Sequence, residues 1–243
     1  MLGFLQKFSI FCFLDNHHYN FHKSYDCLAG AGVFRSVGSE GGGVLQQIDA
    51  LHQSTGDWMF GHVCYDMKNA IEELASHHLD GIGFPDFVFF VPEIVFLVHN
   101  DELHIGVVGN WDPRSIYDEM TFEEPAVVTL QGPVLFKERF TKAEYLATVQ
   151  QLRQHMLRGD CYEINFCQEF FAEGTAIDPA AVYRKLSDGS PNPFAAFYRW
   201  QDRRGREQRQ LMRIRRCPLC GLCAVVSEHG YRTHLALCER RVT

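Results

Sequence analysis

The sequence predicts an α+β fold with largely antiparallel sheets. Residues 87–98 and 103–108 have strand patterns, and the polar stretch between them, residues 99–102, is typical of a hairpin turn. Helical patterns stand between some of the strand patterns and not between others. Strands that meet in hairpins, with helices between only some of them, indicate antiparallel sheets rather than alternating βα units.

Shorter patterns predict the remaining elements. Gly61 lies in an apolar strand pattern, where a side chain would obstruct a close backbone approach. Ile71 and Leu74 are expected to face inward from a short helix, and residues 113–133 look like a connection. Residues 38–43 hold four glycines without the spacing of a phosphate-binding motif, which indicates a mobile loop. Further predicted strands cover residues 8–14, 58–65 and 194–200, and predicted helices cover residues 44–52, 67–77, 141–158 and a segment that begins at Asp178-Pro179.

A helix pattern runs into the stretch around Gly159. Thr141 and Glu144 have the spacing of a capping box, in which each side chain satisfies a backbone donor at the start of the helix. Gly159 tolerates the left-handed conformation at which helices commonly end. The buried stripe of this helix is expected to consist of Tyr145, Val149, Leu152 and Met156.

A strand pattern runs out of the same stretch. From Cys161 the period changes to two, and one face of the predicted strand carries Tyr162, Ile164, Phe166, Gln168 and Phe170. That face is apolar except for Gln168, whose side-chain amide needs hydrogen-bond partners if it is buried. The pattern by itself favours a core strand in which Gln168 pairs with neighbouring backbone over a functional site.

The stretch Gly-Asp-Cys-Tyr-Glu-Ile-Asn-Phe-Cys-Gln at residues 159–168 resembles the signature of chorismate-using enzymes. Its form is typical of aminodeoxychorismate synthase component I, and anthranilate synthase component I carries a close variant. Residues 57–66, 89–93 and 190–198 agree with the same family in order. The resemblance extends over residues 8–200, which correspond to the first half of such an enzyme. The signature residues are Gly159, Asp160, Tyr162, Asn165 and Gln168.

The resemblance implies an incomplete two-sheet sandwich, largely antiparallel and flanked by helices, that encloses the chorismate site. It divides the chain into an N-terminal lobe at residues 1–132, the start of the chorismate-binding domain at residues 133–200, and a tail at residues 201–243. The implied reaction is the amination of chorismate to 4-amino-4-deoxychorismate, a precursor of 4-aminobenzoate and folate. Anthranilate synthesis is the alternative reaction.

The resemblance also implies partners. In this family a separate glutamine amidotransferase subunit supplies ammonia, and Mg²⁺ offsets the charge of the substrate carboxylate. The magnesium-binding glutamates and the catalytic residues of the family lie beyond the matched region. We therefore expect no catalytic residue in this chain and no activity of the chain alone.

A second implied site resembles the tryptophan pocket of the family. In relatives this pocket combines a short N-terminal segment with a proline-rich loop. The corresponding residues are Leu14, Asn16, Pro191, Asn192, Pro193 and Phe194. Asn16 stands where the family usually has serine, so an apolar domain seam is an equal alternative to a ligand site.

Composition indicates a cytoplasmic protein. No stretch approaches the about 20 apolar residues that a membrane span needs. The apolar segment at residues 2–14 is interrupted by Lys7 and lacks a cleavage signal. Cys12, Cys64, Cys161 and Cys167 lie in apolar patterns, which indicates buried reduced thiols. The histidines lack the spacing of a metal motif and are expected on surface loops.

The tail has a different composition from the rest. Residues 1–200 carry 13 Lys and Arg against 26 Asp and Glu, whereas residues 201–243 carry 10 Arg, 4 acidic residues and no Phe. After Leu211-Met212 the chain departs from the family pattern into Arg-Ile-Arg-Arg. A shifted reading of codons for the family's Cys-Ala-Ser-Ala-Glu gives that sequence. We therefore hypothesise a frameshift near Met212 and expect a disordered tail.

An alternative for the tail is a small zinc module. Cys220, Cys223, His234 and Cys238 have ligand residue types, although the gap between the two pairs is shorter than in zinc fingers. Ten arginines would suit nucleic acid. The chain would then be a non-enzymatic binding protein, which we consider less favoured, and we expect no nucleic-acid partner.

Overall fold

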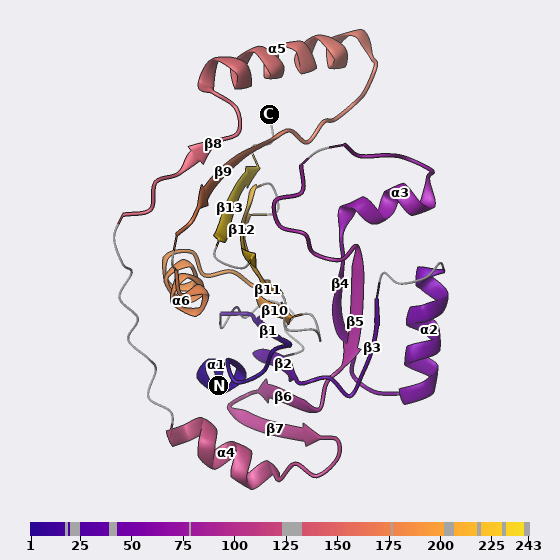
Figure 1. Ribbon diagram of the computed structural model, residues 1–243, viewed down its shortest axis with the longest axis vertical. Helices are drawn as coiled ribbons and strands as arrows, with labels where there is room; N and C mark the ends of the chain where they lie inside the picture. The colour runs from indigo at the N-terminus through magenta and orange to yellow at the C-terminus, as the bar shows by residue number, and fades with distance from the viewer. Residues whose placement is uncertain are drawn as a thin grey trace.

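The computed structural model describes residues 1–17, 19, 25–38, 43–77, 79–122, 133–175, 177–201, 207–217, 220–229 and 232–240, and beyond Trp200 it describes the backbone only. Its described strands form two antiparallel sheets (Figure 1). The larger sheet has ten strands in the order β7-β6-β2-β1-β10-β11-β12-β13-β9-β8, and the smaller has the order β3-β5-β4. The predicted α+β fold with largely antiparallel sheets and flanking helices is confirmed.

The strands of the larger sheet are β1 (Phe11–Asp15), β2 (Cys27–Ala31), β6 (Ile94–His99), β7 (Glu102–Val107), β8 (Lys137–Glu138), β9 (Cys167–Glu173), β10 (Ala195–Gln201), β11 (Glu207–Cys217), β12 (Cys220–His229) and β13 (Arg232–Arg240). Those of the smaller sheet are β3 (Arg35–Gly38), β4 (Phe60–Val63) and β5 (Phe87–Val91). The helices are α1 (Leu2–Leu5), α2 (Val44–Thr55), the 3₁₀ turn η1 (Tyr65–Met67), α3 (Lys68–Ile71), α4 (Pro113–Phe122), α5 (Lys142–Arg158) and α6 (Pro179–Gly189).

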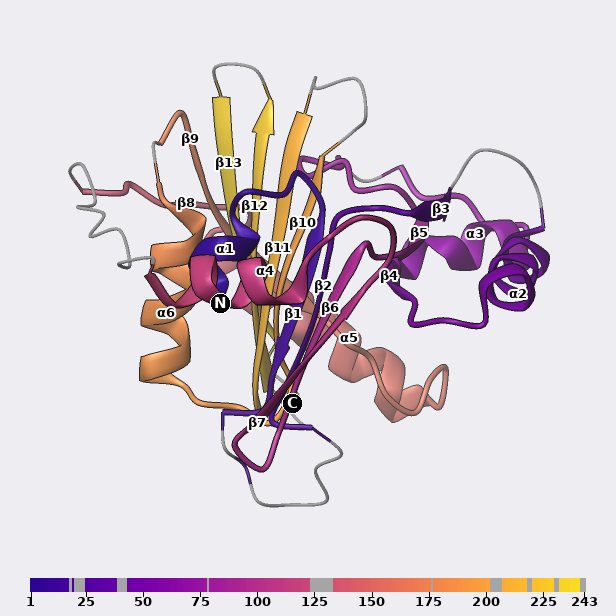
Figure 2. The same ribbon diagram turned by 90° about the horizontal axis from the view of Figure 1, so that it is seen from below.

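Each face of the larger sheet packs against a different layer. Helices α1, α4 and α6 cover one face, and the smaller sheet faces the other, with α2 on the outer side of the smaller sheet (Figures 1 and 2). Strand β10 contributes to both cores, because neighbouring side chains of a strand point to opposite faces. The ring of Phe197 stacks on Tyr183 of α6 at 5.3 Å between centroids, and the ring of Tyr198 stacks on Phe90 of β5 at 6.5 Å.

The predicted hairpin at residues 99–102 is confirmed, and it joins β6 to β7. Asn100 and Asp101 have φ values of 49° and 65°, as a tight turn with two left-handed residues requires. The prediction of one strand over residues 87–98 is wrong. Pro92 and Glu93 separate β5 from β6, and the two strands belong to different sheets.

Gly61 lies where two backbones meet closely, as predicted. A Cβ atom placed on Gly61 would lie 2.0 Å from the carbonyl oxygen of Val88 and 2.8 Å from the Cα atom of Phe89. Both of these residues belong to β5, the neighbour of β4 in the smaller sheet. Any side chain at position 61 would therefore push the two strands apart.

Two helix predictions need correction. The predicted helix over residues 67–77 ends at Ile71, and Ile71 and Leu74 are 68% and 53% exposed instead of inward. The stretch predicted as a connection contains α4, whose Ile116 joins the core. Residues 123–132 of that stretch, and residues 39–42 of the predicted glycine-rich loop, lie outside the described residues.

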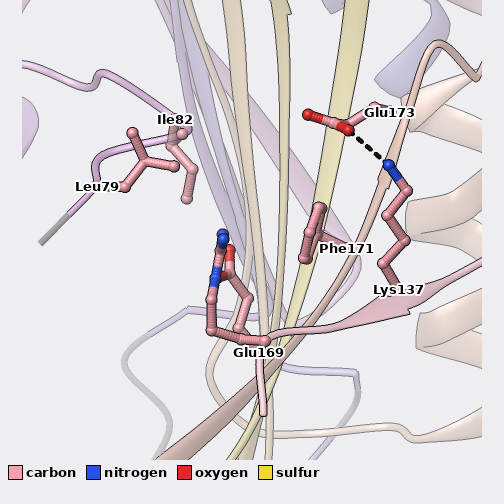
Figure 3. A pocket seen from close by; sticks show the side chains of 8 residues that line it. Leu79, Ile82, Lys137, Glu169, Phe171 and Glu173 are labelled. Atoms are coloured by element: carbon pink, nitrogen blue, oxygen red, sulfur yellow. Dashed lines mark hydrogen bonds and ion pairs between the residues drawn. The ribbon is translucent and has the colours of Figure 1, made fainter. Parts of the chain in front are cut away.

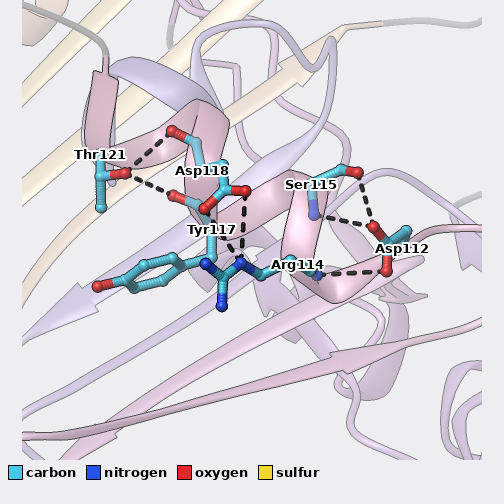
Figure 4. Close-up of polar contacts among 6 residues, drawn as sticks. All are labelled: Asp112, Arg114, Ser115, Tyr117, Asp118 and Thr121. Carbon is cyan, nitrogen blue, oxygen red and sulfur yellow. Dashed lines mark hydrogen bonds and ion pairs between the residues drawn. The ribbon is translucent and has the colours of Figure 1, made fainter.

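Asp112 starts α4 (Figure 4). Its carboxylate accepts hydrogen bonds from the backbone N–H of Ser115 at 3.0 Å and from the Ser115 hydroxyl at 2.6 Å. These hydrogen bonds lower the pKa of the Asp112 carboxyl below its ordinary value. Within α4, Arg114 forms an ion pair at 3.3 Å with Asp118, which lies one turn further along the helix.

The described backbone beyond Trp200 is extended, in the segment for which the sequence predicted a disordered or out-of-frame tail. The backbone of residues 207–217, 220–229 and 232–240 forms the strands β11, β12 and β13, which lie between β10 and β9 (Figure 1). Two successive antiparallel pairings connect them, β11 with β12 and β12 with β13. Strand β9 joins the larger sheet through β13.

Candidate functional site

The helix that precedes the signature has the predicted ends. Thr141 and Glu144 form the capping box, with the Thr141 Oγ1 atom accepting from the Glu144 N–H at 3.3 Å and the Glu144 carboxylate accepting from the Thr141 N–H at 2.8 Å. Gly159 ends α5 with a φ of 83°, and its N–H donates to the Met156 carbonyl. The signature therefore begins at a well-defined helix end.

Asp160 follows Gly159 directly, and its carboxylate binds side chains of the last turn of α5. Its carboxylate accepts hydrogen bonds from the Arg158 guanidinium at 2.8 Å and lies 2.8 Å from the Nδ1 atom of His155. The hydrogen bond from Arg158, and then that from His155, lowers the pKa of the Asp160 carboxyl. All three side chains belong to the last turn of the helix or the residue after its cap, so Asp160 has a local structural role.

The prediction that a strand begins at Cys161 is wrong. Strand β9 begins at Cys167, Tyr162 is 99% exposed, and Asn165 lies on the exposed surface. These residues do not start the strand because they pack against α5, where the Phe166 ring stacks on Tyr145 at 5.2 Å between centroids. The half-buried helical stripe thus faces the segment that follows it in the chain, and residues 161–166 pair with no strand in the described part of the chain.

Gln168 is the buried polar residue of the signature, with 8% of its surface exposed. Its Nε2 atom donates to the Phe140 carbonyl at 2.7 Å, and its Oε1 atom accepts from the Phe140 N–H at 3.3 Å. The predicted pairing of Gln168 with neighbouring backbone is confirmed. These two hydrogen bonds tie the start of α5 to β9.

A cavity of about 160 Å³ adjoins β9 on its other face (Figure 3). Lys137 pairs with Glu173 at 2.9 Å and Arg139 pairs with Glu169 at 2.7 Å. Phe171 stands between Glu169 and Glu173 on β9, and the Arg139 guanidinium lies 4.4 Å from the centroid of its ring. Each cation already has a carboxylate partner, so the lining is charge-balanced and offers no excess charge to a ligand.

These ion pairs could not be predicted from the sequence. Lys137 and Arg139 alternate at β8, and Glu169 and Glu173 alternate along β9, but the two strands are about thirty residues apart in the chain. Only their antiparallel pairing shows which charges meet. Leu79 and Ile82 reach the opposite side of the cavity from a third segment (Figure 3).

A second cavity, of about 220 Å³, lies at the predicted tryptophan-like site. The structure brings four of the six predicted residues together around it: Leu14, Asn16, Pro193 and Phe194. Pro191 is exposed and does not line it. Asn192 is buried beside it, where its backbone meets the Nδ1 atom of His17.

Asn16 itself is occupied in holding this site together. Its Nδ2 atom donates to the carbonyl of Tyr25 at 2.8 Å, and its backbone N–H donates to the carbonyl of Asp26 at 3.1 Å. Asp15 accepts from the N–H of His17 at 2.9 Å. Asn16 and Asp15 therefore fix the end of β1, and the cavity is mainly apolar.

The two described thiols of this region are not reactive nucleophiles. Burial raises the pKa of Cys12 to about 12 and that of Cys27 to about 12, so both stay protonated at neutral pH. Cys12 is buried as predicted, Cys64 and Cys161 are half-buried, and Cys167 is exposed. All of these described cysteines are free thiols.

The predicted zinc residues lie in β12 and β13, where only the backbone is described. Cys223 and Cys238 are cross-strand partners, but His234 pairs with Ser227, four positions further along. In an extended strand this separates the Cα atoms of His234 and Cys238 by roughly 13 Å. The side chains of these four residues lie outside the described part of the structure, so the zinc site stays a prediction.

The described ranges contain neither a metal cluster nor a membrane helix. Within them, no three His, Cys, Asp or Glu side chains are placed to hold a metal ion. No described helix has both the length and the apolar character to cross a bilayer.

The chain is similar to chorismate enzymes in sequence. The model of the chorismate binding enzyme family matches residues 39–205. Anthranilate synthase component 1 of Cereibacter sphaeroides is 24% identical over 160 residues, which cover 58% of this chain and 32% of that protein. Aminodeoxychorismate synthase component 1 of Klebsiella aerogenes is 23% identical over 136 residues, which cover 56% of this chain and 30% of that protein. The chain spans about a third of the length of these curated relatives.

A solved structure has the same fold. Anthranilate synthase component I from Streptococcus pneumoniae TIGR4 superposes with a TM-score of 0.59 at 16% sequence identity. The superposition covers 93% of this chain and 72% of that chain. The described sheets and helices are thus those of a known two-sheet architecture.

Proposed function

Because the chain belongs to the chorismate binding enzyme family, we propose that it is the N-terminal part of component I of an aminodeoxychorismate synthase. Anthranilate synthase component I is the alternative within the family, and relatives with both names match the chain. The observation that carries the proposal is the signature at residues 159–168, in the form Gly-Asp-Cys-Tyr-Glu-Ile-Asn. The full reaction would aminate chorismate with ammonia from a glutamine amidotransferase subunit.

The role of this chain in that reaction is positioning. Gln168 and Phe140 connect α5 to β9, and β9 is a strand of the sheet that would enclose chorismate. In the resemblance to these relatives, the metal-binding and catalytic side chains would come from the part of their length that this chain does not cover. We therefore propose that the chain alone is inactive.

The first experiment incubates the purified chain with chorismate, Mg²⁺ and ammonia and separates the products by chromatography. Neither 4-amino-4-deoxychorismate nor anthranilate should form. Turnover to either product would refute the proposed inactivity of the chain.

The second experiment decides between the two family members. Residues 1–200 are joined to the remaining part of component 1 of Escherichia coli aminodeoxychorismate synthase or of Thermus thermophilus anthranilate synthase, two relatives that the chain resembles. Shape complementarity across the shared sheets should restore activity in the first chimera and not in the second. Activity in the second chimera alone would favour anthranilate synthase, and inactivity of both would contradict an aminating enzyme.

We further propose that the cavity at Leu14 and Phe194 accepts an aromatic amino acid of the tryptophan type. Its volume of about 220 Å³ and its apolar lining support this proposal. Isothermal titration with tryptophan, repeated with Phe194→Ala, tests it, because the exposed Phe194 ring can be removed without opening the core. Absence of binding to the unmodified chain would leave the apolar seam as the better interpretation.

A further inference from the structure

A third cavity, of about 310 Å³, lies where β6 and β7 meet the segment that precedes β4. It shares no lining residue with the cavity beside β9 or with the tryptophan-like site. Its volume falls at the lower end of the about 300–1,000 Å³ typical of small-molecule sites. A ligand with one or two rings is therefore the size that it suits.

The floor of the cavity is apolar. Val95 and Leu97 of β6 are half-buried and point to the same face of the sheet. Gly106 is the cross-strand partner of Val95, and a Cβ atom placed on Gly106 would meet only the Val95 Cβ, at 3.8 Å. The missing side chain at position 106 thus leaves open space above the floor, and this is the space that a flat ring would fill.

The rim of the cavity is acidic. Asp57 and Glu93 both line it, and none of the described lining residues is Lys or Arg. The His104 imidazole also lines the cavity, and its Nε2 atom lies 3.6 Å from the carboxylate of Glu102. Glu93 accepts a hydrogen bond from the Trp111 indole at 3.3 Å, and Asp57 accepts one from the backbone of Trp58 at 2.7 Å. Within the described ranges neither carboxylate forms an ion pair with a basic side chain. A positively charged group would therefore be attracted to this rim, and a carboxylate would be repelled.

Trp58 forms one wall. Its indole is 39% exposed, and the Tyr25 ring holds it edge-on at 5.8 Å between centroids. A supported indole can stack on an aromatic ligand, and among aromatic side chains it attracts cations most strongly. Apolar floor, indole wall and acidic rim together define one chemical class of ligand.

We propose that this cavity binds a protonated aromatic amine. The ring of the ligand lies over Val95 and Gly106 beside Trp58, and its ammonium group faces the carboxylates of Asp57 and Glu93. An aromatic amino acid is a poorer ligand, because its carboxylate meets the same acidic rim. This site does not depend on the chorismate chemistry proposed above.

Isothermal titration of the full chain with three probes of the same ring tests the proposal. Tryptamine carries an ammonium group, indole is neutral, and indole-3-propionate carries a carboxylate. Tryptamine should bind most tightly, and indole should bind about fivefold more weakly for each of the two carboxylates that it cannot pair with. Indole-3-propionate should not bind. Added salt should weaken tryptamine binding and leave indole binding unchanged.

Variants locate the site. Glu93→Gln and Asp57→Asn should each weaken tryptamine binding about fivefold without affecting indole. Gly106→Val should abolish binding of both, because valine suits a strand and its side chain fills the cavity. Glu138→Gln, which removes an exposed carboxylate on β8, should change nothing.

Three results would overturn the proposal. One is the absence of tryptamine binding to the unmodified chain. Another is equal affinity for tryptamine and indole-3-propionate, which would show that the rim exerts no charge selection. The last is tryptamine binding that survives Gly106→Val in a variant with an unchanged circular dichroism spectrum, which would place the ligand elsewhere.

Discussion

The side chain of Gln168 reproduces a backbone pairing with Phe140. One amide group satisfies both the N–H and the carbonyl of Phe140, at 3.3 Å and 2.7 Å, in a place where Gln168 itself is buried. The segment at Phe140 is thereby held to β9 one residue before the Thr141 cap of α5. A residue of the family signature therefore has an architectural task in this chain.

Replacing Gln168 by leucine should destabilise the fold by about 1–3 kcal/mol. Leucine keeps the volume but leaves the N–H and carbonyl of Phe140 without partners. The measurement is urea unfolding followed by tryptophan fluorescence. The matched control is Gln150→Leu on the exposed face of α5, which should stay within about 0.5 kcal/mol of the unmodified chain. Equal effects of the two changes would contradict the role given to Gln168.

Gly61→Ala should be more harmful than any exposed glycine replacement. The new Cβ atom would lie 2.0 Å from the Val88 carbonyl oxygen, so β4 and β5 must separate. We expect a loss of at least about 3 kcal/mol, at the upper end for overpacking. Gly189→Ala serves as the control, since nothing lies within 4 Å of a Cβ atom at that position. A soluble Gly61→Ala protein with unchanged melting temperature would show that the two strands are not this close.

His62 should make the stability of the fold depend on pH. Its Nε2 atom lies 3.0 Å from the Pro85 carbonyl, and its ring contacts Phe84 and Tyr198, each at 5.3 Å between centroids. Burial lowers the pKa of His62 below the ordinary value of 6.5, and the hydrogen bond to Pro85 offsets only part of this shift.

The sign of the effect follows from proton uptake. Below pH 6.5 the unfolded chain binds a proton at position 62 before the folded chain does. The stabilisation is therefore complete above pH 6.5 and declines as the pH falls toward the lowered pKa of the folded state. Urea midpoints at about pH 7.5 and about pH 5.5 should differ less in His62→Phe than in the unmodified chain. The same difference in both proteins would exclude His62 as a source of the pH dependence.

Asp112 should control the stability of α4 at acidic pH. Its pKa is lowered, first by the hydrogen bond from the Ser115 hydroxyl and then by that from the Ser115 N–H. The stabilisation is thus present above the ordinary value of 3.8 and is lost as the pH falls through the lower pKa of the folded state. Asp112→Asn keeps a capping oxygen but cannot titrate. The protection factors of the amides in α4, which correct for the intrinsic pH dependence of exchange, should fall at low pH in the unmodified chain and fall less in this variant, and identical pH profiles would refute the assignment.

Signals confined to a few neighbouring residues can be read from the sequence. The capping box of Thr141 and Glu144, the helix end at Gly159 and the cap at Asp178 all depend on hydrogen bonds within one turn. The start of α4 has the same Asp-Pro signal as the start of α6, at Asp112 and Pro113. The prediction of a connection there is wrong because Asp112 and Pro113 supply an N-cap and a first helical residue, and the prediction did not take this signal into account.

Signals that depend on distant partners cannot be read in the same way. Residues 161–166 alternate like a strand, yet Phe166 stacks on Tyr145 and the strand begins only at Cys167. A strand needs a neighbour to satisfy its backbone, and the sequence does not state which segment that neighbour is. The three strands of the tail are not predicted because the arginine content of the tail obscures their pattern.

By itself the sequence determined the family, the antiparallel α+β class, the ends of the longest helix and four residues that line the cavity at Leu14 and Phe194. Tertiary structure alone decided that Gln168 pairs with Phe140, that Lys137 and Arg139 meet the carboxylates of β9, and that an acidic rim lies above Gly106. The physical reason is the distance along the chain between interacting residues. Caps and turns are satisfied by residues a few positions away, whereas buried polar pairs and cavities form only after remote strands have been brought into register.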